Sequence, residues 1–239
     1  MSRRIAGGTP VCFTANARHE LQWWSSLSHA APLTADPPGR ALADLLHHPT
    51  ATMSCFTDAS SDGLGAFFAP VGQMNTAGGS AWLQLWVPHE FRAGKRFHWL
   101  EFGANDRAPL PLTVSSGWLE AAAVLAAVRR WGPGPWRGQA VTLYCDNESV
   151  GQMWRRQSSP TPIMGAFARA IAWECATWEL SLHIEWLAGV TNTLADAISR
   201  LQVHPARLPR VLSPTPAWLG PAPWPVLTAG LLLHSCERA

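Results

Sequence analysis

The segment ATMSCFTDASSDGLGAFFA (residues 51–69) decides the fold that we expect for this chain. Thr52–Thr57 is predicted to form a strand that ends at Asp58, because the turn residues Ser60-Ser61-Asp62-Gly63 follow it closely. Leu64–Ala69 is predicted to form the second strand. The segment therefore predicts a β-hairpin whose first strand carries an acidic side chain at its carboxyl end.

The elements after this hairpin alternate between strand and helix. Ala81–Val87 is predicted as a third strand, and the Ala- and Leu-rich Trp118–Trp131 as a helix that stops at Gly132-Pro133. Val141–Cys145 is predicted as a strand that leads into Asp146. Helices over residues 148–157 and 163–178, a strand over 182–187 and a last helix over 192–201 complete the order.

This order predicts an α/β fold. A meander of strands followed by helix-linked strands is typical of a mixed sheet, here with helices on both faces. The strands that end at Asp58 and Asp146 are expected to be parallel neighbours, joined by a right-handed crossover through the Trp118–Trp131 helix. We therefore expect a mixed five-stranded sheet with the strand order 3-2-1-4-5. Residues 88–116 are expected to form an insertion or an irregular region around the third strand.

The chain divides into three zones of different composition. Residues 1–50 are expected to form a connecting segment with a short helix around Glu20–Leu27. Residues 51–202 are expected to form the folded domain. Residues 203–239 are rich in proline, and we expect a tail with little regular structure.

The composition argues against several classes of protein. The net charge of +2 is not the footprint of a strongly basic nucleic-acid binder, although a local arginine-rich face would not alter this sum. The five cysteines are odd in number and form no C-x-x-C pair, which argues against a disulfide framework or a zinc site. We find no apolar run of signal-peptide or membrane-span length, so we expect an intracellular protein of the cytoplasm or nucleus without a membrane partner.

Four acidic residues are the candidates for chemistry. Asp58 and Asp146 follow strands that are expected to be neighbours, and strand ends at a switch in strand order form the usual ligand-binding edge of such sheets. Glu120 is expected in the first turn of the crossover helix, which begins at this edge. Asp196 lies on the last helix, one turn before Arg200.

Four converging carboxylates predict a divalent-metal site, because they would repel one another without a cation. Mg²⁺ prefers oxygen ligands and commonly combines carboxylates with water and phosphate. Two such ions can activate a water molecule and stabilise the leaving oxygen of a phosphodiester. We therefore expect two Mg²⁺ ions, with Mn²⁺ as a substitute, and all four residues as catalytic metal ligands.

Each carboxylate also has a purely structural interpretation. Glu120 could be an ordinary acid at the start of a helix, and Asp146 could belong to a helix cap. Asp196 could pair with Arg200 on a solvated helix face. Glu101 is a rival to Glu120, but no crossover helix is predicted after it.

Fourteen tryptophans are an unusual number for 239 residues. Six of them occupy predicted helix or strand positions that favour packing in the core, namely Trp118, Trp131, Trp154, Trp173, Trp178 and Trp186. One or two could instead stack on the bases or sugars of a nucleic acid.

Several short motifs resemble the ribonuclease H domains of retroelements. FTDAS (residues 56–60) with GLGA (63–66) looks like their first hairpin, and WLEA (118–121) resembles their helix-borne L-E-x-x-A element. LYCDNES (143–149) resembles x-T-D-N-x-S. NTLADAISR (192–200) closely resembles the N-x-x-A-D-x-L-S-R that ends these domains in long-terminal-repeat and DIRS-type retrotransposons. The motifs occur in the family's order over residues 51–202.

This resemblance implies a ribonuclease H-like fold and metal-dependent endonucleolytic cleavage of the RNA strand of RNA–DNA hybrids. It implies a part of a reverse transcriptase, with the polymerase domain as a further partner and the segment before residue 51 as the connection to it. It also implies substrate contacts, which we expect from Ser60, Asn147, Ser149 and Asn192.

The sequence departs from many ribonucleases H at one loop. A histidine before the last helix, which is thought to assist product release in relatives, is absent from residues 185–189, and His183 lies on the preceding strand instead. A 3′–5′ exonuclease would carry D-x-E where Asp58-Ala59-Ser60 stands, and a transposase-type nuclease would carry Glu at Asp196. The alternative that stays open is a catalytically weak or domesticated ribonuclease H-fold module that binds nucleic acid.

Overall fold

The computed structural model describes residues 50–71, 81–87, 89–99, 110–157 and 159–200. The predicted helix at Glu20–Leu27, the connecting segment and the Pro-rich tail lie outside these ranges, as does Glu101. The proposed domain boundaries therefore stay predictions.

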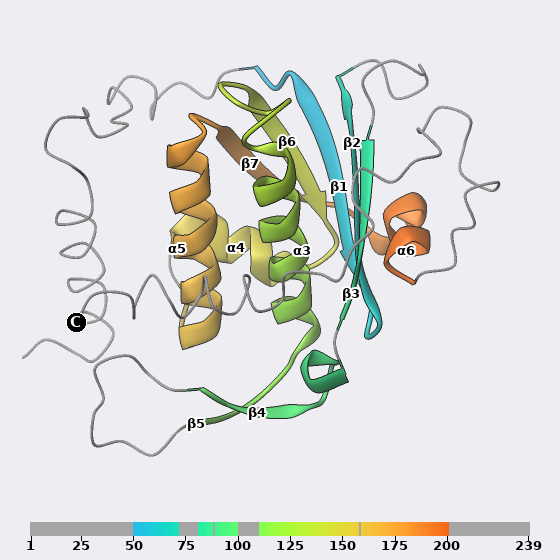
Figure 1. Cartoon of the computed structure of the whole chain (residues 1–239), viewed down its shortest axis with the longest axis vertical. Helices are drawn as coiled ribbons and strands as arrows, with labels where there is room; N and C mark the ends of the chain where they lie inside the picture. Colours follow the sequence, from blue (N-terminus) through green and yellow to red (C-terminus); the bar gives the residue numbers. More distant parts are fainter. Residues whose placement is uncertain (1–49, 72–80, 88, 100–109, 158, 201–239) are drawn as a thin grey trace, which may run out of the picture.

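A five-stranded sheet organises the described part of the chain, in the order β3-β2-β1-β6-β7 (Figure 1). β2 is antiparallel to both β1 and β3, whereas β6 is parallel to both β1 and β7. The predicted mixed sheet with the order 3-2-1-4-5 is confirmed. The strands are β1 (Met53–Ala59), β2 (Gly63–Pro70), β3 (Ala81–Trp86), β6 (Ala140–Cys145) and β7 (Ser181–Trp186).

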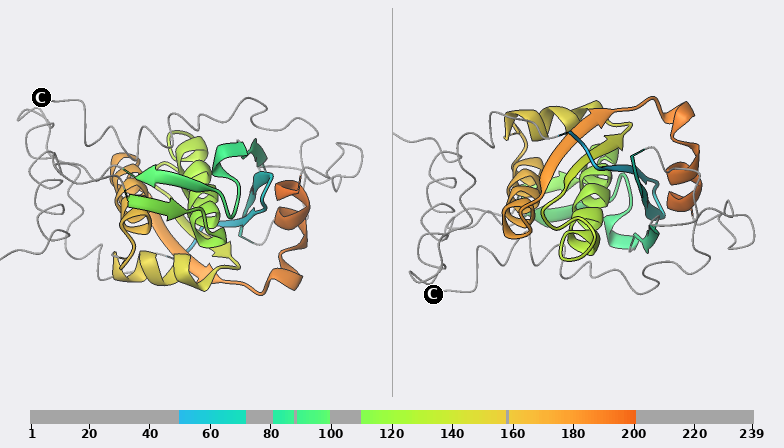
Figure 2. Two further views of the ribbon diagram at one scale, coloured as in Figure 1. Left: turned by 90° about the horizontal axis from the view of Figure 1, so that it is seen from below. Right: turned by 90° about the horizontal axis from the view of Figure 1, so that it is seen from above.

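Helices cover both faces of this sheet, as predicted. α3, α4 and α5 lie on one face, and α6 lies on the other against β1, β2 and β3 (Figures 1 and 2). Within the described ranges, no helix is both long and apolar enough to span a membrane. The helices are α3 (Ser116–Trp131), α4 (Glu148–Arg156), α5 (Pro162–Thr177) and α6 (Thr193–Ser199), with short 3₁₀ helices η1 (His89–Phe91) and η2 (Gly189–Thr191).

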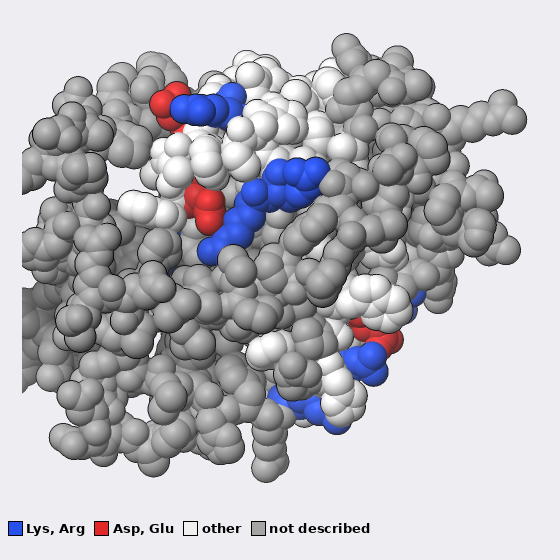
Figure 3. Space-filling view, in the orientation of Figure 1, with Lys and Arg blue, Asp and Glu red and all other residues white. Residues whose placement is uncertain are grey.

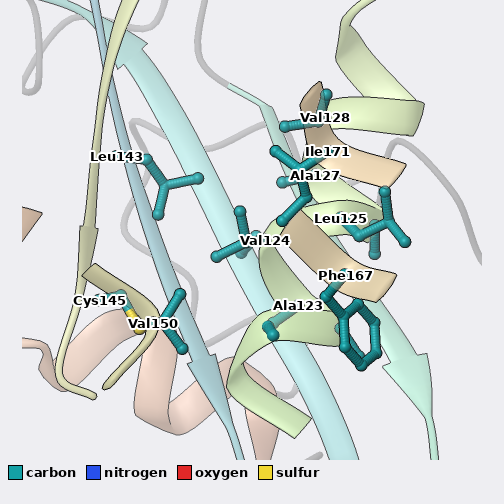
Figure 4. Close-up of a cluster of buried hydrophobic side chains, with 14 of the residues drawn as sticks. Ala123, Val124, Leu125, Ala127, Val128, Leu143, Cys145, Val150, Phe167 and Ile171 are labelled. Atoms are coloured by element: carbon teal, nitrogen blue, oxygen red, sulfur yellow. The ribbon is translucent and has the colours of Figure 1, made fainter. Parts of the chain in front are cut away.

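The main core lies between the sheet and α3 and α5. α3 is buried along most of its length, which is typical of a helix that is apolar on all sides. Val124 and Leu125 of α3 belong to the same buried cluster as Leu143 of β6 and Phe167 of α5 (Figure 4). Truncation of such a leucine to alanine typically costs about 2–5 kcal/mol. This core fixes α3 against the strands that lead to the acidic residues.

The outer surface of the helical layer carries mixed charges. Arg129 of α3 forms an ion pair with Glu174 of α5 at 2.8 Å. Figure 3 shows basic side chains beside acidic ones on this face, among mostly uncharged described residues.

A smaller core under α6 contains Phe67, Trp82, Ala195 and Ile198.

Two local details differ from the predictions. α3 begins at Ser116 because Ser115 caps it, accepting a hydrogen bond of 3.2 Å from the N–H of Trp118. Glu120 therefore lies in the second turn of the helix and not in the first. The region predicted to be irregular contains η1 and a separate antiparallel pair of strands, β4 (Arg96–Trp99) and β5 (Leu110–Thr113).

Candidate metal centre

Asp58 is a buried carboxylate near the end of β1. Its side chain is 5% exposed, and its Oδ2 accepts a hydrogen bond from the hydroxyl of Ser199 on α6. Burial raises the pKa of Asp58 to about 6; the hydrogen bond from Ser199 opposes this rise, and the charges of Asp146 and Asp196 add to it. The negative charge of Asp58 is therefore costly unless a cation lies nearby.

Glu120 joins α3 to the ends of two strands. Its Oε1 accepts a hydrogen bond of 2.9 Å from the main-chain N–H of Ala59, and its Oε2 accepts one of 3.6 Å from the thiol of Cys145. Burial raises the pKa of Glu120 well above its ordinary value, and the charges of Asp58 and Asp146 raise it further. Both oxygens of this carboxylate are thus held at the carboxyl ends of β1 and β6.

Asp146 follows β6 and contacts the loop after β7. Its main-chain carbonyl accepts a hydrogen bond of 3.0 Å from Nε1–H of Trp186. Its Oδ2 lies so close to Gly189 that a Cβ at position 189 would be 2.8 Å away. Burial raises the pKa of Asp146, and the charge of Asp196 adds to this effect.

Asp196 lies on α6 and its side chain is 38% exposed, whereas Asp58 and Glu120 are buried. Its Oδ1 accepts a hydrogen bond of 2.7 Å from Nε of Arg200, so the helix ion pair considered from the sequence is present. Its charge nevertheless raises the pKa of both Asp58 and Asp146, which places it within electrostatic reach of the cluster.

The tightest group of metal-ligating atoms in the described ranges comes from Glu120, Cys145 and Asp146, which lie within 4.8 Å of one another. Asp58 and Asp196 do not belong to this tightest group, but their charges act on it. The charge of Asp58 raises the pKa of Glu120, and the charge of Asp196 raises the pKa of Asp146. Cys145 was not among the candidate residues predicted from the sequence, although its position directly before Asp146 was the available signal. Burial raises the pKa of the Cys145 thiol well above its ordinary value, so it acts as a neutral donor to Glu120.

Ser60 and Asn192, two of the expected substrate contacts, make structural hydrogen bonds. Ser60 Oγ donates to the carbonyl of Ser199 at 2.8 Å and accepts from the N–H of Gly63 at 3.0 Å. Asn192 is 2% exposed, and its Nδ2 donates to the carbonyl of Thr57 at 2.8 Å. Both residues hold α6 against β1 and the hairpin turn, and their contact with substrate stays a prediction.

Asn147 and Ser149, the other two, lie at the start of α4. Asn147 caps this helix, because its Oδ1 accepts hydrogen bonds from the N–H of Ser149, at 3.1 Å, and from its hydroxyl. The interpretation of this segment as a helix cap is therefore correct. A contact of either residue with nucleic acid stays a prediction.

Gly65 of β2 allows α6 to approach the sheet closely. A Cβ at this position would lie 2.5 Å from the main-chain nitrogen of Ser199 and 2.6 Å from the carbonyl oxygen of Ala195. Real Cβ atoms essentially never show such distances, so only glycine fits without movement of the helix. This close contact is what brings the Ser199 hydroxyl to Asp58.

The expectation that the six tryptophans pack in the core is wrong for Trp186. Trp118 and Trp131 are buried as expected, but Trp186 is 57% exposed. It is the last residue of the edge strand β7, and its indole N–H bonds to Asp146 instead of entering the core. His183 on the same strand is half exposed and lies 3.4 Å from Glu185.

Comparison with known proteins gives remote structural likenesses. No family model and no curated protein sequence match this chain. RNase H1 from the archaeon Halobacterium salinarum NRC-1 shares 13% identity at a TM-score of 0.44, over 63% of this chain and 98% of that one. The N-terminal RNase H domain of a Mycobacterium tuberculosis protein, solved as a fusion with maltose-binding protein, shares 11% at a TM-score of 0.34, over 64% and 100%.

A viral enzyme is similar over a small part of its length. The protease–reverse transcriptase of prototype foamy virus shares 13% identity at a TM-score of 0.33, over 65% of this chain and 21% of that one. This chain thus spans about a fifth of the viral protein. At identities of 11–13%, the function of this chain has to be argued from its own residues.

Proposed function

We propose that this chain is a divalent-metal-dependent nuclease that cleaves the RNA strand of RNA–DNA hybrids. The observation that carries the proposal is the cluster at the carboxyl ends of β1 and β6, where burial and mutual repulsion raise the pKa values of Asp58, Glu120 and Asp146. Carboxylates with raised pKa values at a switch in strand order are candidates for a functional site. All three residues, and Asp196 as well, lie within the motifs that resemble those of retroelement ribonuclease H domains.

The chemistry of the donor set fits Mg²⁺. This ion takes oxygen ligands, and its charge would relieve the repulsion that the raised pKa values indicate. Asp58, Glu120, Asp146 and Asp196 would hold two ions, and Mn²⁺ could take the same ligands. Bound ions of this kind activate water and stabilise the leaving oxygen of a phosphodiester.

The chain's own groups orient these ligands. The Ser199 hydroxyl holds one oxygen of Asp58, and the N–H of Ala59 holds one oxygen of Glu120. Such hydrogen bonds to metal-binding carboxylates fix their direction before the metal arrives. Preformed ligands are what a site for positioned phosphodiester hydrolysis requires.

The substrate class and the origin rest on the motifs. A hybrid would be selected by the shape of its minor groove and by the ribose 2′-hydroxyls, without reading base sequence. We assign the chain to the ribonuclease H part of a retroelement reverse transcriptase, of the long-terminal-repeat or DIRS type, with a polymerase domain as partner. One observation favours the alternative of a weak or inactive hybrid-binding module. Nε of Arg200 lies 2.7 Å from Oδ1 of Asp196, so this carboxylate already has a cationic partner.

The test is a cleavage assay with the full chain and a hybrid labelled on its RNA strand. In millimolar Mg²⁺ we expect cleavage of RNA in the hybrid, no cleavage of single-stranded RNA or duplex DNA, and no cleavage in EDTA. Asp58→Asn and Asp146→Asn should abolish activity. Asp62→Asn is the matched control, because Asp62 pairs with Arg92 at 3.1 Å and is not among the charges that raise the pKa values of Asp58, Glu120 and Asp146.

The outcomes separate the two candidates. Activity of Asp58→Asn and Asp146→Asn equal to that of the wild type would contradict the nuclease assignment. Binding of the hybrid without turnover in millimolar Mg²⁺ would favour the binding module.

A further inference from the structure

Trp186 presents an exposed indole ring directly beside the candidate metal centre. Its side chain is 57% exposed, while its Nε1–H donates a hydrogen bond of 3.0 Å to the main-chain carbonyl of Asp146. In the parallel pair of β6 and β7 it stands opposite Cys145, the residue before Asp146. The hydrogen bond fixes the direction of the ring, so that an aromatic face is held next to the acidic cluster.

The loop that follows Trp186 carries a second exposed apolar side chain. Val190 is 86% exposed. The loop around it is ordered by main-chain hydrogen bonds, from Leu187 N–H to the carbonyl of Cys145 at 3.0 Å and from Asn192 N–H to the carbonyl of Gly189 at 3.0 Å. A Cβ added at Gly189, the neighbour of Val190, would lie only 2.8 Å from Oδ2 of Asp146. Both apolar side chains thus belong to a segment, residues 186–190, that lies beside Asp146.

We propose that Trp186 and Val190 form the contact surface for the sugar of the nucleotide next to the phosphate bound at Asp146. This inference rests on the proposed function and names the residues that grip its substrate. A polynucleotide with a phosphate at Asp146 must pass the residues that surround this carboxylate, and the loop of Trp186 and Val190 is one of them. An aromatic face suits such a duplex because the sugar rings along its minor groove can pack on the ring, whatever the base sequence.

A nucleic acid fits this surface better than a protein does. A stable protein–protein interface buries about 800 Å² on each partner. Two side chains offer far less area, and they lie against carboxylates that would need a metal and a phosphate to be neutralised. A small aromatic contact beside a phosphate site matches instead the size of one sugar of a nucleic-acid strand.

The experiment measures hybrid binding by the full chain with a fluorescein-labelled RNA–DNA hybrid. Fluorescence anisotropy in millimolar Ca²⁺, which also takes oxygen ligands, gives the Kd with a cation on the carboxylates, and gel analysis verifies that the RNA strand stays intact. Turnover in Mg²⁺ gives KM and kcat. Trp186→Ala is expected to raise both Kd and KM by roughly 5- to 30-fold, because apolar contact with the sugar is lost, with kcat close to wild type. Trp186→Phe keeps a ring face and loses the N–H that orients it, so its Kd should lie between those of the wild type and of Trp186→Ala.

Two further variants complete the design. Val190→Ala should weaken binding by a smaller factor than Trp186→Ala. Val71→Ala is the matched control, because Val71 is 53% exposed and lies beside Thr52 at the opposite end of the sheet. It should bind as the wild type does. Mn²⁺ affinity and the thermal unfolding midpoint of each variant are measured alongside, and both should stay near the wild-type values.

Three results would overturn the inference. Hybrid binding of Trp186→Ala equal to wild type would do so, and would leave a protein partner or residues 203–239 as the occupant of this surface. Loss of binding in Trp186→Phe as large as in Trp186→Ala would show that only the N–H to Asp146 matters. A wild-type chain that binds no hybrid would contradict the inference and the proposed function together, whereas binding that depends on Trp186 without RNA cleavage would contradict the nuclease alone.

Discussion

The main-chain N–H of Ala59 donates a hydrogen bond of 2.9 Å to Oε1 of Glu120, so that β1 and α3 meet at a buried carboxylate. This carboxylate is 4% exposed and lies near the charges of Asp58 and Asp146, which raise its pKa. Glu120 therefore serves two purposes that substitutions can separate. An amide can replace it as a hydrogen-bond acceptor, but only the carboxylate brings charge to a cation.

Glu120→Gln is expected to abolish Mg²⁺-dependent cleavage without loss of stability. In EDTA at neutral pH its free energy of unfolding should equal or exceed that of the wild type, because a buried charge beside two carboxylates is removed. Glu120→Ala should instead lower the free energy of unfolding by about 1–3 kcal/mol, since the N–H of Ala59 loses its acceptor. Urea unfolding and the cleavage assay measure both effects, and full activity of Glu120→Gln would refute the assignment.

The raised pKa of Asp58 makes the stability of the metal-free protein depend on pH. Its carboxyl has an ordinary pKa of 3.8 and a pKa of about 6 in the folded chain, so the folded state binds the proton more tightly. The resulting contribution to the free energy of unfolding is complete below pH 3.8 and is lost as the pH rises through about 6. For Asp58 the loss is at most about 3 kcal/mol, and the raised pKa values of Glu120 and Asp146 act in the same direction.

Mg²⁺ is expected to offset this loss. Its stabilising effect should be small at about pH 5, where the proton competes with the metal, and larger at about pH 7.5, where the carboxylates are ionised. Urea unfolding in EDTA and in excess Mg²⁺ at both pH values measures the difference. An equal gain from Mg²⁺ at the two pH values would mean that the metal does not bind these carboxylates.

Gly189→Ala is expected to displace the carboxylate of Asp146, because the added Cβ would lie 2.8 Å from Oδ2. A displacement of this kind typically costs about 100-fold in rate, and the affinity for Mn²⁺ should fall with it. Gly134→Ala is the matched control, since its Cβ would meet only the carbonyl of Trp131 at 3.9 Å. Turnover and Mn²⁺ titration compare the two variants. Equal turnover and equal Mn²⁺ affinity would show that the loop moves to accommodate the Cβ and that Asp146 is not displaced.

Gly65→Ala is expected to push α6 away from β2, because the added Cβ would collide with main-chain atoms of Ala195 and Ser199. Overpacking of this kind typically costs about 1–3 kcal/mol in the free energy of unfolding. Activity should fall as well, since Asp196 and the hydroxyl that holds Asp58 move with the helix. Thermal unfolding and the cleavage assay test this expectation, and a variant as stable and active as wild type would contradict it.

The ends of β1 and β6 could be predicted because they are marked locally. Turn residues follow Asp58, and the helix cap at Asn147 follows Asp146, so the position of each acid depends only on its neighbours. The hydrophobic content of residues 118–131 similarly predicts α3. Its first turn was misplaced because two adjacent serines, Ser115 and Ser116, could each cap it, and only the folded structure shows that Ser115 is the cap.

The contacts that orient the acids could not be predicted in the same way. Ser199 reaches Asp58 only because α6 packs on Gly65, and Trp186 meets Asp146 only where β7 ends beside β6. Each of these pairs is distant in sequence, and no periodic pattern relates their positions. The ion pair of Asp196 with Arg200 was foreseeable from its spacing of four residues.

A shared divalent-metal site is tested most directly by isothermal titration of the full chain with Mn²⁺ at neutral pH. Wild type and Asp62→Asn are expected to bind Mn²⁺ with the same affinity, whereas Asp146→Asn should bind it at least about tenfold more weakly, since a ligand and its charge are lost. Failure of the wild type to bind Mn²⁺, or an affinity of Asp146→Asn equal to that of the wild type, would contradict the site.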